Sequence, residues 1–291
     1  MGDVALEAGA DVLYGGRGVD RILLEVEGRF DLSGRSVEAI RFAAGFGEDK
    51  RLILSVATFD PGGGFGDTIV IGNSGADSTD ALTLRVDPGS SPDLSLRDWA
   101  FRDWEDGPDR ILLRGDGRSN TIQGPGEADR IDGRIGGDLL HGRGGDDMLR
   151  GGGGADRLRG GAGHDVLEGG RGADILSGGK GRDVFRYTDL ADSSPDAMDV
   201  ILDFDPERDR IDVSALDARA GSDRDDAFVF LGLTSMREVR EAGPGALWLE
   251  DTGSATMLMC NVDRNAAADL AVLLEDGGRG ASSYDEDTLL L

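Results

Sequence analysis

The sequence predicts an all-β fold in which short strands stack as a solenoid. The first reason is a repeat: from Gly115 to Arg186 the chain divides without a gap into eight segments of nine residues, each beginning with Gly. The second is a large apolar residue at the eighth position of every segment. A disordered chain has no reason to space apolar residues so regularly, whereas stacked strands that share one thin core require it.

The eight segments share three fixed positions. The first is Gly, the eighth is Ile, Leu or Phe, and the sixth is Asp in all but one segment, where Asn120 replaces it. The regular segments are GGGGADRLR (151–159), GGAGHDVLE (160–168), GGRGADILS (169–177) and GGKGRDVFR (178–186), and the less regular ones are GDGRSNTIQ, GPGEADRID, GRIGGDLLH and GRGGDDMLR over 115–150. Four regular copies in unbroken register with four others make the pattern specific.

Each fixed position has a physical role. Glycine permits turns with positive φ and close approach of neighbouring loops. The apolar eighth residue is expected to lie in a short strand and to point inward, and the Asp to end the turn with its carboxylate facing the next loop. Carboxylate and turn-carbonyl oxygens are hard ligands, and several of them at about 2.3–2.6 Å suit Ca²⁺. A metal-free solenoid is the alternative, but it would stack Asp on Asp without compensation. One Cys and two His in the whole chain offer no ligand cluster for zinc or copper.

These segments resemble the RTX repeat, G-G-x-G-x-D-x-U-x, of secreted bacterial proteins. The resemblance implies a right-handed parallel β-roll in which two segments make one turn, with Ca²⁺ between loops two segments apart. One side would stack the loops that end in Asn120, Asp138, Asp156 and Asp174, and the other side those that end in Asp129, Asp147, Asp165 and Asp183. Pro125 and Arg134 depart from Gly at the second position, which weakens the sites at the N-terminal end of the block.

The resemblance also implies which residues hold the several calcium ions. The carboxylates are those of the seven sixth-position Asp residues. Backbone carbonyls of the loop glycines would complete the ligand shells, and the glycines concerned are Gly151, Gly152, Gly154, Gly160, Gly161, Gly163, Gly169, Gly170, Gly172, Gly178, Gly179 and Gly181. The best sites are expected where Asp156 stacks with Asp174 and Asp165 with Asp183.

Residues 1–114 are predicted to be an irregular β-rich region with degenerate repeats, either a solenoid or a β-sandwich. EAGADVLYGGRGVDRIL (7–23) contains two segments of the repeat type, and β-like runs follow at 51–59, 68–71, 81–86 and 110–113, separated by Gly, Pro and Asp turns. A helix is expected over 36–44. Trp99, Phe101 and Trp104 are interpreted as core anchors, with a binding platform as the alternative.

Residues 187–291 are predicted to form the C-terminal cap, because the end of a solenoid exposes unpaired strand edges and core. Residues 199–218, DVILDFDPERDRIDVSALDA, resemble the segment that follows the RTX block in serralysin-family proteases. Further strands are expected at 227–231, 246–250, 256–262 and 269–274. The ending YDEDTLLL (284–291) resembles the uncleaved signal of type I secretion, and an ordinary last strand is the alternative.

Composition narrows the function. The chain has 57 acidic and 31 basic residues and a net charge of −26, which opposes binding to nucleic acid or to an anionic membrane surface. No apolar run approaches the roughly 20 residues of a membrane span, and the start of the chain has no signal-peptide pattern. The lone Cys260 forms no internal disulfide and is expected to be buried.

Catalytic motifs are absent from the sequence. Serralysin-type zinc proteolysis requires HExxH, which the chain lacks, and its two histidines, His141 and His164, are expected to face solvent. The sequence therefore favours a secreted, extracellular calcium-binding protein that leaves the cell unfolded through a type I exporter and folds on Ca²⁺, without catalytic activity of its own. Two alternatives remain: the export and folding module of a larger secreted enzyme, and a polysaccharide lyase or epimerase with its site in 1–114.

Overall fold

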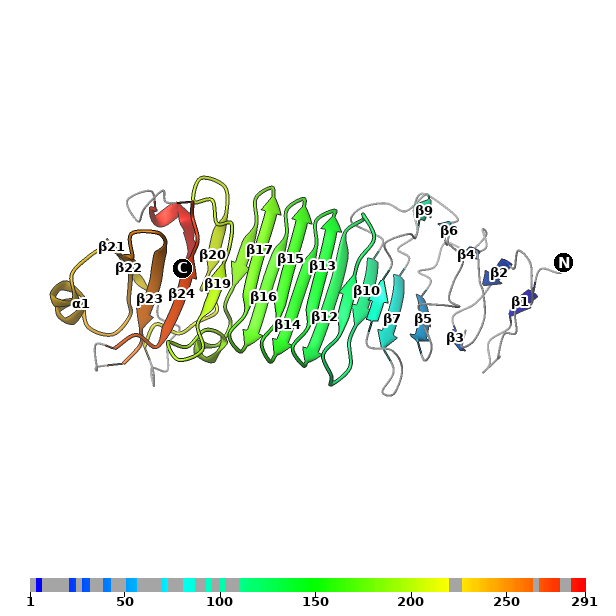
Figure 1. The fold of residues 1–291 in the computed structure, drawn as a ribbon, viewed down its shortest axis with the longest axis horizontal. Coiled ribbons are helices and arrows are strands. Elements are labelled where there is room, and N and C mark those ends of the chain that lie inside the picture. The colour runs from blue at the N-terminus through cyan, green and yellow to red at the C-terminus, as the bar shows by residue number, and fades with distance from the viewer. Residues whose placement is uncertain are drawn as a thin grey trace. The chain divides into compact units, whose positions relative to one another are not determined.

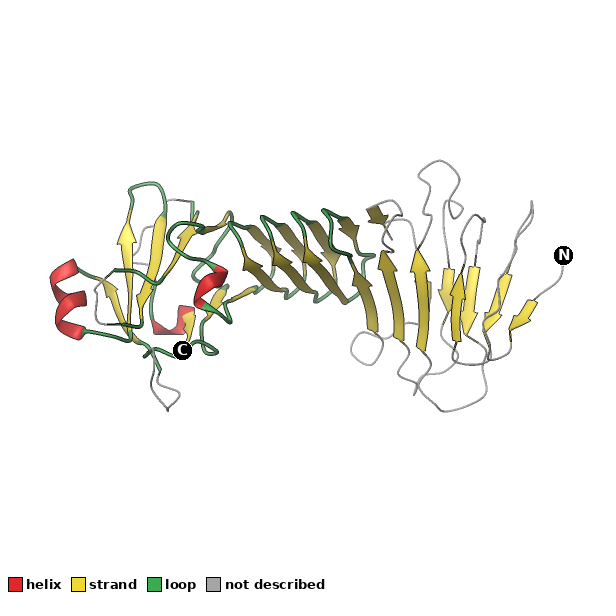
Figure 2. Ribbon diagram, turned by 90° about the horizontal axis from the view of Figure 1, so that it is seen from below, coloured by secondary structure: helices red, strands yellow, loops and turns green. Residues whose placement is uncertain are grey.

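The computed structural model describes residues 110–219, 227–263, 267–277 and 284–291 and, before residue 110, the backbone of the short strands β1 to β9. The chain divides into two compact units, Met1–Met148 and Leu149–Leu291. Strands dominate both units, as Figures 1 and 2 show. The all-β fold that the repeats predict is confirmed.

The strands of the first unit pair in parallel. One sheet contains β1 (Val4–Leu6), β2 (Arg21–Leu24), β4 (Ala39–Phe42), β6 (Val70–Gly72) and β9 (Ala100–Arg102). A second contains β3 (Gly28–Asp31), β5 (Arg51–Val56), β7 (Ala81–Val86), β10 (Arg110–Arg114) and β12 (Asp129–Ile135), and a third contains β8 (Asp93–Ser95), β11 (Thr121–Gln123) and β13 (Leu139–Gly144). Parallel pairing is typical of a solenoid and not of a β-sandwich.

One expectation for this unit is wrong. The helix predicted over 36–44 is replaced by strand β4, which pairs in parallel with β2 and β6. Hydrogen bonding to two neighbouring strands outweighs the weak helix propensity of the segment. Trp99 and Trp104 lie outside the described residues, so their interpretation as core anchors stays a prediction.

The second unit contains the regular β-roll. Consecutive strands alternate between two parallel sheets, and each residue pairs with the residue 18 positions further along the chain. The roll strands are β14 (Met148–Gly153), β15 (Arg157–Ala162), β16 (Val166–Arg171), β17 (Ile175–Lys180), β18 (Val184–Arg186), β19 (Asp199–Ile201) and β20 (Arg210–Asp212). The roll therefore extends past the last regular repeat, with longer connections before β19 and β20.

The eighth-position residues form the core of the roll. All of them have exposed fractions of 2% or less, namely Ile122, Ile131, Leu140, Leu149, Leu158, Leu167, Leu176 and Phe185. Ile201 and Ile211 take the same place on β19 and β20 and are also fully buried. These side chains come alternately from the two sheets, with one large apolar residue per repeat, which confirms the thin core that the repeat predicts.

Residues after the repeats pair with the last strands of the roll, and their assignment as a cap stays a prediction. β24 (Leu270–Leu274) pairs in parallel with β19, and β25 (Leu289–Leu290) pairs in parallel with β20. β23 (Thr256–Asn261) and β22 (Ala246–Asp251) extend the first of these sheets in antiparallel pairing, and β21 (Val229–Leu233) follows. Buried Cys260 lies on β23, as expected. Among the described residues of the unit, 3-10 turns occur at Leu190–Asp192 and Glu286–Thr288.

Aromatic side chains close the core beneath this cap. The ring of Phe204 lies 5.9 Å from that of Phe185 and is stacked 5.6 Å from that of Tyr284. The short helix α1 (Met236–Ala242) begins with a capping box formed by Ser235 and Glu238. Its one buried side chain joins a second small core with Trp248 and Met259. Among the described helices, none has the length and apolarity of a membrane span.

Truncating one of the buried eighth-position side chains is expected to destabilise the protein. Leu158→Ala leaves a cavity that no second layer of side chains fills, and we expect a loss of about 2–5 kcal/mol in the free energy of unfolding. Urea unfolding in saturating calcium measures it. Arg159→Ala, at the exposed neighbouring position, is the matched control and should change the free energy by less than about 0.5 kcal/mol. Equal losses for the two variants would contradict this account of the core.

Candidate calcium sites

Glycine is required in the repeat loops for two different reasons. At the second and fourth positions the backbone has positive φ, for example 111° at Gly152 and 128° at Gly154. At the first position φ is ordinary, but the side chain of the same repeat's Asp folds back against the glycine. A Cβ on Gly169 would meet Oδ2 of Asp174, and a Cβ on Gly178 would meet Oδ2 of Asp183. The first-position glycine therefore makes room for a carboxylate.

The sixth-position carboxylates form ladders along the loops. Oδ1 of Asp138, Asp147, Asp174 and Asp183 accepts a hydrogen bond from the backbone N–H of the Asp or Asn 18 residues earlier, one turn before it. The distances are 2.8 Å from Asp156 to Asp174 and 3.0 Å from Asp165 to Asp183. The same bond joins Asn120 to Asp138 and Asp129 to Asp147. The ladder holds each carboxylate in one orientation.

The second oxygen of these carboxylates is left for another ligand. The Oδ2 atoms of Asp174, Asp183 and Asp199 are buried and accept no hydrogen bond from the described residues. The carbonyl of a glycine one turn later lies close to such an atom. A Cβ built on Gly151 would contact Oδ2 of Asp156, and it would also lie 2.6 Å from the carbonyl oxygen of Gly169. Carboxylate and carbonyl oxygens thus face a common space between stacked loops.

Burial makes these carboxylates unfavourable as isolated anions. Burial raises the pKa of Asp174 to about 6, and the nearby charge of Asp192 adds to it. Burial likewise raises the pKa of Asp199 to about 8, helped by the charge of Asp174. The buried hydroxyl of Tyr187 lies beside Asp199 and opposes this rise, although the pair lacks hydrogen-bond geometry. Buried carboxylates require a proton or a cation.

Calcium fits this donor set. The ligands are all hard oxygens, and the loop backbone holds them in place. The negative charges of Asp174 and Asp199 are not neutralised by a described side chain of opposite charge. No group of three or more Asp, Glu, His or Cys side chains gathers anywhere in the described part of the chain. An ion held here would therefore depend on one or two carboxylates together with backbone carbonyls, as the sequence predicts.

The less regular repeats keep the ladder but strain the loops. Arg134 and Arg143 occupy the second position with φ of 81° and 87°, a conformation that side chains rarely adopt. Their carboxylates, Asp138 and Asp147, are nonetheless buried like those of the regular repeats. Of these two, Arg134 is the one that the sequence analysis named as a departure; the departure is in the residue type, because the backbone conformation and the burial of the carboxylate are kept.

Two ladder residues were missed as metal-site candidates. Asp199 accepts the N–H of Asp174 at 2.9 Å, and Asp209 accepts the N–H of Asp183 at 3.1 Å. The separations are 25 and 26 residues instead of 18, so the nonamer period does not reach them. The available signal was the serralysin-like pattern, in which Asp199 and Asp209 each lie within two residues of an apolar strand residue.

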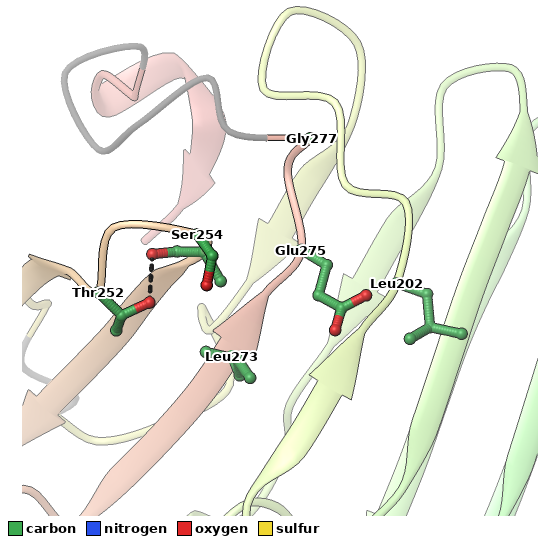
Figure 3. A pocket seen from close by; sticks show the side chains of 7 residues that line it. Leu202, Thr252, Ser254, Leu273, Glu275 and Gly277 are labelled. Atoms are coloured by element: carbon green, nitrogen blue, oxygen red, sulfur yellow. Dashed lines mark hydrogen bonds between the residues drawn. The ribbon is translucent and has the colours of Figure 1, made fainter.

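Other candidate features carry no comparable chemistry. His164 is exposed, and its Nδ1 accepts the N–H of Arg182 at 2.9 Å, whereas His141 is half-buried on β13. A pocket of about 360 Å³ lies beside β24, where Thr252 donates a hydrogen bond to the carbonyl of Ala255 (Figure 3). Its lining contains one ionisable side chain, that of Glu275, and therefore no acid–base pair; the lining residues are Leu202, Thr252, Ser254, Ala255, Leu273, Glu275 and Gly277.

Comparison with known proteins agrees with this geometry. Residues 6–24, 114–149 and 150–185 match the family model of the RTX calcium-binding nonapeptide repeat. The chain therefore carries RTX calcium-binding repeats, including the N-terminal pair predicted at 7–23. The match ends at residue 185, so the likeness of the C-terminal region to serralysins stays a prediction. No curated protein matches the chain.

The solved structures that are similar to the chain include two subunits of one enzyme. One is the solution structure of the AlgE6R3 subunit of the Azotobacter vinelandii mannuronan C5-epimerase, with 29% identity, 62% of this chain and 77% of that chain covered, and a TM-score of 0.31. The other is the AlgE6R2 subunit of the same epimerase, with 26% identity, 61% of this chain and 91% of that chain covered, and a TM-score of 0.34.

A methyl group at the first glycine of a repeat is expected to displace the carboxylate. Gly169→Ala places Cβ against Asp174, so we expect at least tenfold weaker calcium binding and a loss of about 1–3 kcal/mol in stability. Calorimetric calcium titration and urea unfolding measure the two effects. The control is Gly153→Ala, where a Cβ meets nothing within 4 Å. Similar calcium affinities for both variants would contradict the role assigned to the first position.

Without calcium, the fold is expected to gain stability as the pH falls. The folded-state pKa values of Asp199, Asp174 and Asp209, about 8, 6 and 6, exceed that of an unfolded Asp, about 3.9. Protonation of these groups therefore stabilises the folded state. This stabilisation is complete below about pH 3.9 and decreases as the pH rises to 8.

Circular dichroism of calcium-free protein should accordingly give more β-structure at pH 5 than at pH 8. In Asp199→Asn the part of this response between pH 6 and 8 should be smaller. With calcium present the order reverses, because protons compete with the metal. More structure at pH 8 than at pH 5 in the calcium-free protein would refute the assignment.

Proposed function

We propose that this chain is a secreted calcium-binding protein whose β-roll folds when Ca²⁺ binds outside the cell, with no catalytic activity of its own. The observation that supports it most directly is the row of buried carboxylates between glycine loops, in which Oδ2 of Asp174, Asp183 and Asp199 accepts no hydrogen bond from the described residues. In this proposal residues 115–186 are the calcium-binding roll, 1–114 an irregular β-rich region that precedes it, and 187–291 the cap with the secretion signal.

The chain's own residues explain how folding would depend on the metal. Without a cation, folding must bury like charges such as Asp174 and Asp199 beside one another, and one apolar residue per nonamer offsets little of that cost. Bound calcium supplies the positive charge between the loops. At a free concentration 100-fold above Kd, each independent site adds about 2.7 kcal/mol to the stability of the folded state. Several sites together would convert an unfolded chain into a folded one.

Export through a type I exporter is consistent with this dependence. A net charge of −26 keeps a calcium-free chain soluble and expanded, which suits passage through a narrow channel. In the folded chain the last residues are a strand: Leu289 is buried, and Tyr284 donates a hydrogen bond to Asp276 at 3.1 Å. The two interpretations of these residues are compatible, because a signal read in the unfolded chain becomes the last strand once the protein folds.

Circular dichroism in a calcium chelator and in millimolar calcium tests the proposal. We expect β-structure with calcium, its loss in EGTA, and recovery when calcium is added back. The double variant Asp165→Ala, Asp174→Ala should still bind several ions but should require more calcium to fold. Equal β-structure of the wild type in EGTA and calcium at pH 8 would refute coupled folding.

A further inference from the structure

The first loop of the repeat block and the loop that ends the ladder differ from the regular loops in the same way. These loops are 115–120, with the sequence GDGRSN, and 204–209, with the sequence FDPERD. At the second position, where regular repeats have Gly with positive φ, they have Asp116 and Asp205. Both aspartates are largely buried, with exposed fractions of 6% and 9%.

Each of these aspartates is neutralised inside its own loop. Nε of Arg118 lies 2.7 Å from Oδ2 of Asp116, and a terminal guanidinium nitrogen lies 2.6 Å from the same oxygen. In the other loop, Nε of Arg208 lies 2.7 Å from Oδ2 of Asp205. The remaining oxygen of each carboxylate accepts a backbone N–H two residues later, from Arg118 at 2.9 Å and from Glu207 at 3.2 Å.

The sixth position is also satisfied within the loop. Oδ1 of Asn120 accepts the N–H of Asp116 at 2.9 Å, and Oδ2 of Asp209 accepts the N–H of Asp205 at 2.9 Å. In the regular loops the corresponding oxygen, such as Oδ2 of Asp174 or Asp183, accepts no hydrogen bond from the described residues. A positive charge and a hydrogen bond thus come from the loop itself in these two cases.

We propose that loops 115–120 and 204–209 bind no calcium of their own, because an arginine guanidinium takes over the role that a calcium ion has in the loops between them. This inference rests on the proposed function, since it presumes calcium in the regular loops. It confines the calcium sites to the spaces beside carboxylates whose second oxygen is unused. It also assigns a task to Arg118 and Arg208 that the nonamer pattern does not contain.

Counting bound ions in the full chain tests the inference. Native mass spectrometry in a fixed excess of calcium should give the same ion number for Asp205→Asn as for the wild type, and at least one ion fewer for Asp174→Asn. The loss of an ion in Asp205→Asn would overturn the inference. Retention of every ion in Asp174→Asn would instead overturn the proposed function, so the two failures are distinguishable. Asp116→Asn repeats the test at the other loop, should Asp205→Asn fail to fold in calcium.

Removal of the arginine supplies an independent measurement. Arg208→Gln removes the guanidinium that pairs with Oδ2 of Asp205, and we expect this variant to bind one ion more than the wild type. Arg186→Gln is the matched control, because Arg186 pairs with Asp212 at 2.9 Å between strands β18 and β20 and outside any loop; its ion number should equal that of the wild type. An unchanged ion number in Arg208→Gln would mean that the guanidinium does not take the place of a cation.

Discussion

Carboxylates buried between stacked glycine loops are the constraint on which the rest of this structure depends. Asp174 and Asp183 are each held by a hydrogen bond from the backbone N–H one turn earlier, which fixes Oδ1, while Oδ2 accepts no hydrogen bond from the described residues. Anions in such positions are unstable unless a proton or a cation accompanies them. The apolar core offsets little of this cost, because each repeat contributes one large apolar side chain to it.

The same constraint explains the composition of the chain. A carboxylate that folds back against its own loop requires a glycine beneath it, and a loop that turns with positive φ requires glycines at the second and fourth positions. Glycine and aspartate therefore recur together in the repeat block for one structural reason. Arg134 and Arg143, with positive φ, show that the backbone conformation is kept even where the preferred residue is absent.

The fold of the repeat block could be predicted from the sequence because every turn has the same length and the same apolar position. The prediction of ladder residues failed where the nine-residue period of the sequence ends. Asp199 and Asp209 continue the ladder, but connections of 25 and 26 residues hide them from a search with period nine. The sequence predicts a helix over 36–44, whereas the structure has strand β4 there. The prediction fails because the pairing of this strand with β2 and β6 is a tertiary property that no local pattern contains. Individual hydrogen bonds, such as that from Asp116 to Asn120, were equally inaccessible.

A loop at the end of the ladder faces a different problem from a loop in its interior. An interior loop has carboxylates and carbonyls on both sides, so an ion between two loops collects ligands from each. The loop 204–209 has no later ladder loop among the described residues, and an ion on that side would meet half a ligand shell and water. An internal ion pair such as Arg208 with Asp205 satisfies the charge without a second loop, and its side chains, at 49% and 13% exposed, tolerate the contact with solvent. In the proposed arrangement, metal ions between the interior loops and arginine in the loops 115–120 and 204–209 are two solutions to one requirement, which is that no loop carboxylate is left both buried and unneutralised.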